Sequence, residues 1–115
     1  MKYLCLVYQD EKEGPKTPKA EMDKMVGEYQ AFGESIKKSG HYIGSYGLQP
    51  TSAATTVRVR NGKISTTDGP FAETKDQLLG YFLIEATDLN EAIQIGARIP
   101  AARVGCVEVR PVWER

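Results

Sequence analysis

Four stretches of the chain have the apolar character of β-strands. Lys2–Gln9 is rich in β-branched and aromatic residues, and Leu79–Ala86 is the most apolar of the four. His41–Tyr46 is shorter and contains Gly44, while Val104–Val112 alternates valines with polar or small residues. This spacing of apolar segments predicts four strands, distributed from near the start of the chain to near its end.

A first helix is predicted between Pro18 and Ser39. The pair Thr17-Pro18 is a typical helix start, because threonine caps and proline suits the first helical position. Gly40 follows two lysines at the expected end. Apolar side chains recur at the spacing of one helical face, at Met22, Met25, Val26, Tyr29, Phe32 and Ile36.

A second, shorter helix follows the most apolar strand. Asp88 and Glu91 have the spacing of a capping box, and Pro100 is expected to end the helix. The positions expected to face the core are Leu89, Ala92, Ile93, Gly96 and Ala97.

A hairpin is predicted between the second and third of the four strands. Thr55–Arg60 alternates apolar and polar residues, Asn61-Gly62 is a strong turn signal, and Lys63–Thr67 returns. The resulting order is βαβ, hairpin, βαβ. It predicts a single α+β domain over residues 1–115, a ferredoxin-like sandwich with both helices on one face of the sheet.

The strands are apolar on both faces, although two helices cover only one. In the first strand Tyr3, Cys5 and Val7 point one way, while Leu4, Leu6 and Tyr8 point the other. Two arrangements would cover the second face. One is a homodimer that packs this face against another copy, and the other is a monomer whose hairpin and loop fold over it.

Composition excludes several classes of protein. The 15 basic and 15 acidic residues cancel, so no basic excess favours direct binding of nucleic acid. No apolar run is long enough to span a membrane, and two cysteines, Cys5 and Cys106, lack the spacing of a zinc site. We therefore expect a cytoplasmic protein with no metal and no nucleotide cofactor.

Candidate charged site residues lie on the last strand. Glu108 and Arg110 share a face with Cys106, opposite the valines that would meet the helices. They form either a structural ion pair or a ligand-binding arginine oriented by the glutamate. We expect both side chains to be substantially buried, and Arg110 to meet an acid from elsewhere, Asp68 or Glu73, in the same chain or across a dimer. Replacing Arg110 by alanine would then cost about 3–5 kcal/mol.

A second candidate is the turn Asp68-Gly69-Pro70-Phe71. Asp68 either stabilises this turn through its own backbone or presents an acid at the rim of a pocket. Phe71 is expected to anchor the loop. Lys75, in the polar stretch that follows, and Tyr81 complete the candidate set as ligand-binding residues.

The segment Asp68–Lys75 (DGPFAETK) resembles the signature of the DGPF subgroup of YCII-related proteins. The match extends along most of the chain, through Gly80-Tyr81, Asp88–Ala92 and Val107–Pro111. The resemblance implies a dimeric α+β barrel in which two sheets enclose a cavity. Relatives carry a histidine in the first helix, and residues 18–39 contain none.

The residues and the resemblance together give two alternative functions, and of the site residues only Asp68 is carried over from the family. One is metal-independent proton transfer, of lyase or isomerase type, on a small organic or aromatic molecule. Asp68 would act as the acid or base of this reaction. The substrate would be bound by Arg110, Glu108 and Lys75, and Tyr81 would line the wall of the substrate pocket. The other is a non-catalytic ligand sensor or interaction module, linked to transcription regulation that depends on a sigma factor.

Overall fold

The computed structural model describes residues 1–114 and has the predicted α+β architecture. A four-stranded sheet forms the body of the molecule. Its spatial order is β2 (Tyr42–Gly47), β5 (Gln77–Glu85), β1 (Lys2–Gln9) and β6 (Cys106–Pro111), with antiparallel neighbours throughout. This is the strand order of a ferredoxin-like fold, so the fold class is confirmed.

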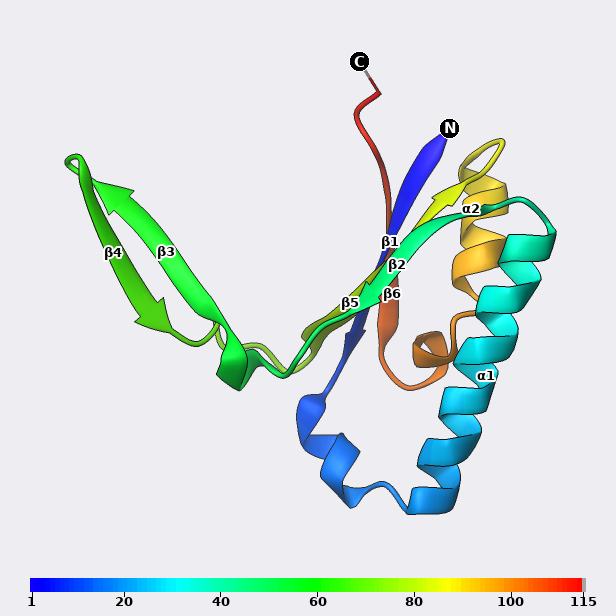
Figure 1. Cartoon of the computed structure of the whole chain (residues 1–115), viewed down its shortest axis with the longest axis horizontal. Helices are drawn as coiled ribbons and strands as arrows, with labels where there is room; N and C mark the ends of the chain where they lie inside the picture. The colour runs from blue at the N-terminus through cyan, green and yellow to red at the C-terminus, as the bar shows by residue number, and fades with distance from the viewer. Residues whose placement is uncertain (115) are drawn as a thin grey trace.

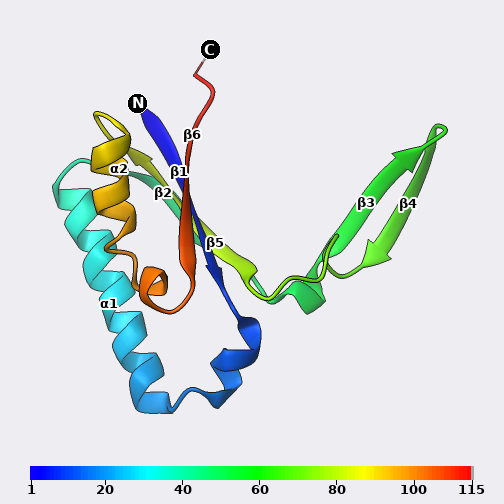
Figure 2. The same ribbon diagram turned by 180° about the vertical axis from the view of Figure 1, so that it is seen from behind.

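Both main helices lie on the same side of the sheet, as Figures 1 and 2 show from opposite directions. They are α1 (Lys19–Lys38) and α2 (Leu89–Gly96). Three short 3₁₀ helices occupy the connections: η1 (Glu11–Lys16), η2 (Thr51–Ala53) and η3 (Pro100–Arg103). No helix in the described part of the chain combines the length and the apolar character needed to cross a bilayer.

The hairpin stands away from this body. Strands β3 (Thr55–Arg60) and β4 (Lys63–Asp68) pair only with each other, and Figure 1 shows them projecting from the far end of β2 and β5. The turn is the one the sequence predicts, since Asn61 and Gly62 have φ values of 53° and 74°. We call β3, its turn and β4 the arm. Because the arm projects, it does not fold over the body of its own chain.

The core lies between the sheet and the helices. On β1 Tyr3, Cys5 and Val7 are buried, while Leu4, Leu6 and Tyr8 on the other face are only half-buried. The predicted division of β1 into two apolar faces is therefore confirmed. We call the side without helices the open face; its members on the other body strands include Tyr46, Tyr81, Leu83, Cys106, Glu108 and Arg110.

The apolar stripe of α1 meets the sheet over only part of its length. Phe32 and Ile36 are buried, but Met22 and Val26 are 44% and 53% exposed. The helix begins without the predicted threonine cap, because the Thr17 hydroxyl donates instead to the carbonyl of Glu13. The N-terminal half of α1 therefore leans away from the sheet and presents an apolar surface.

The second helix is shorter than predicted. It begins as expected, with the Asp88 carboxylate accepting from the Glu91 N–H at 2.9 Å. It ends at Gly96, and Pro100 starts η3 instead of closing the helix. The buried face is also shifted, since Ile95 is buried and Ile93 is 47% exposed. Packing onto β6 causes this shift. The helix lies so close to β6 at Gly96 that an added Cβ would lie 3.2 Å from the Val109 side chain.

Two glycines inside α1 give a direct test of helix stability. A Cβ added at Gly27 or Gly33 would meet no atom within 4 Å. Replacing either by alanine should raise the free energy of unfolding by about 0.5–1 kcal/mol, because alanine loses less backbone entropy in a helix. Urea denaturation measures the change.

Gly105→Ala is the contrasting variant, because its Cβ would sit 2.0 Å from the Tyr8 carbonyl oxygen. It should destabilise the fold by about 1–3 kcal/mol; equal effects at all three positions would contradict this packing.

The two cysteines should differ in reactivity. Burial in the core raises the pKa of the Cys5 thiol to about 11. In a Cys106→Ser variant Cys5 is the remaining thiol, and at pH 8 its thiolate fraction is small because the pH lies well below that pKa. We expect no reaction with Ellman's reagent in native buffer and one thiol per chain in denaturant. Rapid labelling of the native variant would show that Cys5 is not enclosed.

Candidate functional site

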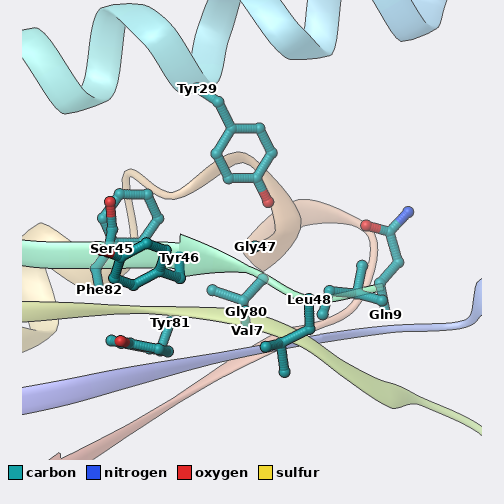
Figure 3. A pocket seen from close by; sticks show the side chains of 11 residues that line it. Val7, Gln9, Tyr29, Ser45, Tyr46, Gly47, Leu48, Gly80, Tyr81 and Phe82 are labelled. Atoms are coloured by element: carbon teal, nitrogen blue, oxygen red, sulfur yellow. The ribbon is translucent and has the colours of Figure 1, made fainter. Parts of the chain in front are cut away.

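A pocket opens at the end of the sheet where β2 and β5 approach the loop to the arm (Figure 3). Its volume is about 370 Å³, within the range of small-molecule sites. We call it the aromatic pocket. Its lining residues are Val7, Gln9, Tyr29, Ser45, Tyr46, Gly47, Leu48, Leu79, Gly80, Tyr81 and Phe82.

Aromatic rings from α1 and from the sheet form the walls. Tyr29 extends from the helix toward the sheet and lies parallel to Phe82, with ring centroids 6.5 Å apart and planes within 5°. Phe82 also packs edge-on against Phe32, at 5.0 Å. Tyr46 and Tyr81 also line the pocket, but they belong to the open face of the sheet, where their rings pair across β2 and β5 with centroids 6.2 Å apart. On the helix side, the rings of Tyr29 and Phe82 offer flat apolar surface.

A glycine fixes the position of the β2 edge. A Cβ on Gly80 would lie 2.6 Å from the Tyr46 carbonyl oxygen and 3.1 Å from the Gly47 Cα. Any other residue at this position would push β2 away from β5 and would displace the Tyr46 side of the pocket. The β1–β5 register also shifts beside this point, between Val7 and Tyr8. The backbone at this end of the sheet therefore determines the shape of the pocket.

Tyr29 supplies a polar group to this apolar space. Burial raises the pKa of its hydroxyl, and this effect outweighs the opposing influences of the Ala101 backbone and the Arg103 charge. The phenol consequently stays protonated at neutral pH and can donate or accept a hydrogen bond. Arg103 is held nearby by Glu28, one residue before Tyr29, with an N–O distance of 2.8 Å.

A larger groove of about 720 Å³ adjoins the aromatic pocket between η1 and the N-terminal half of α1. The two share Gln9, Tyr29, Leu48 and Leu79. The groove is lined by the uncovered apolar side chains of α1 and has acidic residues around it, Asp10, Glu11, Glu13 and Glu21. The helical spacing of Met22, Met25, Val26 and Tyr29 indicates an apolar face of the helix, and part of that face lines this groove.

The structure separates the residues predicted to form one site. Tyr81 lines the aromatic pocket, as expected of a wall residue. Asp68 ends β4 in the arm, and Lys75 lies exposed in the loop before β5. Glu108 and Arg110 lie on the open face of β6. Within one chain, therefore, the four charged candidates are not among the residues that line the pocket.

The expected environment of Arg110 is wrong for the single chain. Its side chain is 66% exposed, and that of Glu108 is 43% exposed. Arg110 pairs with Glu108 rather than with Asp68 or Glu73; its Nε donates to the Glu108 Oε2 at 2.9 Å, and a terminal nitrogen contacts the same oxygen. Such a solvent-exposed pair contributes about 0–1 kcal/mol, not the several expected of a buried one. Local pairing along one strand prevails because, in the described part of the chain, both helices lie on the other side of the sheet (Figure 1).

The Asp68 turn is held by its backbone rather than by Phe71. Gly69 has φ of 101°, and its N–H donates to the Ala54 carbonyl at 2.7 Å. The Thr56 hydroxyl donates to the Gly69 carbonyl at 2.8 Å. Phe71 is 79% exposed, so its predicted role as an anchor is wrong within one chain. The Asp68 side chain is exposed at the base of the arm.

One cluster was not visible in the sequence. Ser39, His41 and Glu91 form a chain, with Ser39 Oγ 2.6 Å from His41 Nδ1 and His41 Nε2 3.3 Å from Glu91. This arrangement resembles a hydrolase triad only in composition. The N–H groups of Gly40 and His41 already donate to Lys37 and Ile36, so they are not available to bind an oxyanion. The cluster instead joins the end of α1 to the first turn of α2.

Together, these observations describe a small α+β protein with a ferredoxin-like sheet and a pocket at one end of that sheet. A family model for the YCII-related domain matches residues 1–115. The chain is also 36% identical over 114 residues to the uncharacterized protein R00369 of Rhizobium meliloti (strain 1021), covering 97% of this chain and 92% of that protein. The chain belongs to the YCII-related domain family.

Proposed function

We propose that this protein binds a small, flat organic molecule in the aromatic pocket. The observation that carries the proposal is the parallel pair of rings, Tyr29 from α1 and Phe82 from β5, beside one space of about 370 Å³. Pockets of this size, mostly apolar with a few polar groups, are typical of small-molecule sites.

The side chains that line the pocket limit the kind of molecule that can bind there. None of its lining residues, all within the described part of the chain, is Asp, Glu, Lys or Arg. An ionised group inside the pocket would lose hydration without gaining a charged partner, so the enclosed part of the ligand is neutral. The hydroxyl of Tyr29, together with Gln9 and Ser45, provides hydrogen bonds for a polar substituent.

A variant that fills the mouth of the pocket tests this proposal. Leu48 lines the pocket and is 49% exposed; Leu89, on α2 and outside the lining, is 48% exposed and provides the matched control. Leu48→Trp should weaken binding of 2-naphthol about tenfold or more in isothermal titration, because the larger side chain occupies ligand volume. Leu89→Trp should bind as the unchanged protein does. Equal affinity in all three proteins would place the ligand elsewhere, and no binding to the unchanged protein would remove the proposal for this ligand class.

The functional protein is proposed to be a homodimer. The support is the open face, where Leu4, Leu6, Tyr8, Tyr81 and Leu83 remain half-buried without a covering layer. A second copy has the same uncovered surface, so one two-fold dimer can supply the missing cover to both copies. The resemblance of residues 68–75 to the DGPF subgroup, which implies a dimeric α+β barrel, agrees with this arrangement.

A second candidate function is proton transfer on an enolisable organic molecule, with Asp68 as acid or base. Its support is the fixed turn: hydrogen bonds of Gly69 with Ala54 and Thr56 hold the backbone beside Asp68, so the residue itself is anchored at the base of the arm. Arg110, Glu108 and Lys75 are the proposed partners for a polar substrate group. The alternative for the same surfaces is a ligand sensor coupled to a sigma factor, which requires no reaction at Asp68.

Hydrogen–deuterium exchange into pentane-2,4-dione separates these two functions. A catalytic Asp68 should make the protein accelerate exchange at the central carbon above the buffer rate, and Asp68→Asn should return it to that rate. Asp23→Asn, at an exposed position of α1, is the control and should retain the acceleration. Activity retained in Asp68→Asn, or no acceleration by the unchanged protein, would contradict this role for Asp68.

A further inference from the structure

The arm has two chemically different faces. Register pairs Val59 with Ile64 and Val57 with Thr66, which places Val57, Val59 and Ile64 together on one side of the ribbon. They are 60%, 57% and 76% exposed. The opposite side carries the basic residues Arg58, Arg60 and Lys63.

An arm of this kind is not expected to stand alone in water. A two-stranded ribbon is at best marginally stable by itself, and an exposed apolar hairpin is an aggregation hazard. Nothing in the body of the same chain covers it, since β3 and β4 are exposed over nearly their whole length. The basic side is suited to solvent, so the apolar side is the one that needs a partner.

The exposed area indicates how large that partner surface is. The chain exposes 8284 Å², whereas a compact monomer of its mass exposes about 6,200 Å². Its radius of gyration is 16.1 Å, against about 13 Å for a compact domain of this length. The surplus of about 2,000 Å² per chain is in the range that stable homodimers bury.

We infer that the apolar side of the arm lies across the open face of a second copy. This inference rests on the proposed homodimer and does not require a ligand in the aromatic pocket, although Tyr46 and Tyr81 belong both to the open face and to the pocket lining. Each chain has one such arm and one such uncovered face, so a two-fold exchange satisfies both surfaces and closes without further copies.

The charges agree with this pairing. Asp68 lies on the apolar side of the arm, opposite Thr55, and is the acidic residue of that side. The open face carries Arg110, whose side chain remains 66% exposed although two of its nitrogens contact Glu108. The acid on the apolar side of the arm and the arginine on the open face are thus complementary charges, which favours this pairing between copies.

Two pairs of substitutions test the faces of the arm. Val59→Glu with Ile64→Glu adds two negative charges to the apolar side, and Ser65→Glu with Thr67→Glu adds two to the opposite side. In sedimentation equilibrium the first pair should weaken dimerisation at least about tenfold, because charge enters an apolar contact. The second pair should leave it unchanged. Equal effects of the two pairs would overturn the inference.

Photo-crosslinking then identifies the surface that the arm contacts. Benzoylphenylalanine at position 64 is compared with the same group at position 63, on the opposite side of the ribbon, in a mixture of ¹⁵N-labelled and unlabelled chains. The inference requires isotopically mixed crosslinks from position 64 to β1, β5 or β6, and few from position 63.

The remaining outcomes separate the two proposals. A protein that sediments as a monomer contradicts the homodimer and the arm contact together. A dimer whose position-64 crosslinks join residues of one chain, or reach the groove beside α1 and η1, contradicts the arm contact alone. A dimer without crosslinks above the position-63 control also contradicts the arm contact and leaves the homodimer standing.

Discussion

The organisation of this protein depends on a four-stranded sheet that is apolar on both faces and has helices on only one. The core of the single chain forms where α1 and α2 cover Tyr3, Cys5, Val7 and Ile84. The opposite face has no such layer. Hydrophobic burial, the main favourable term in folding, is therefore complete on one side of the sheet and unfinished on the other. The exposed arm, the excess surface and the proposed dimer all follow from this asymmetry.

The aromatic pocket is a consequence of how α1 diverges from the sheet. Phe32 and Ile36 bring the C-terminal half of the helix into the core, whereas Met22 and Val26 remain exposed at the other end. Tyr29 lies between the buried and the exposed parts of the helix. Its ring still stacks on Phe82, but space remains beside Gly80. The same residue thus belongs partly to the core and partly to the pocket, which explains why burial raises its pKa.

Charged residues on the open face show why ion pairs are difficult to assign from sequence. Glu108 and Arg110 were correctly placed on one face of β6, because alternation along a strand is a local property. Their burial and their partners depend on whichever surface lies opposite. In one chain, over the described residues, no helix covers this face, and the two pair with each other in partial contact with water. In the proposed dimer the arm of the other copy would supply both the cover and the second acid.

The sequence by itself determined the class of fold, the order of the elements and the turn of the hairpin. These features depend on the period of apolar residues, on capping residues and on a turn pair, all of which act within a few positions along the chain. Tertiary structure decided the rest: the separation of the arm from the body, the end of α2 at Gly96, the pocket around Tyr29 and the distance of Asp68 from Arg110. These depend on how elements distant in sequence approach one another, as when the Gly80 Cα meets the β2 backbone. Local patterns do not encode such approaches, because packing of whole surfaces determines them.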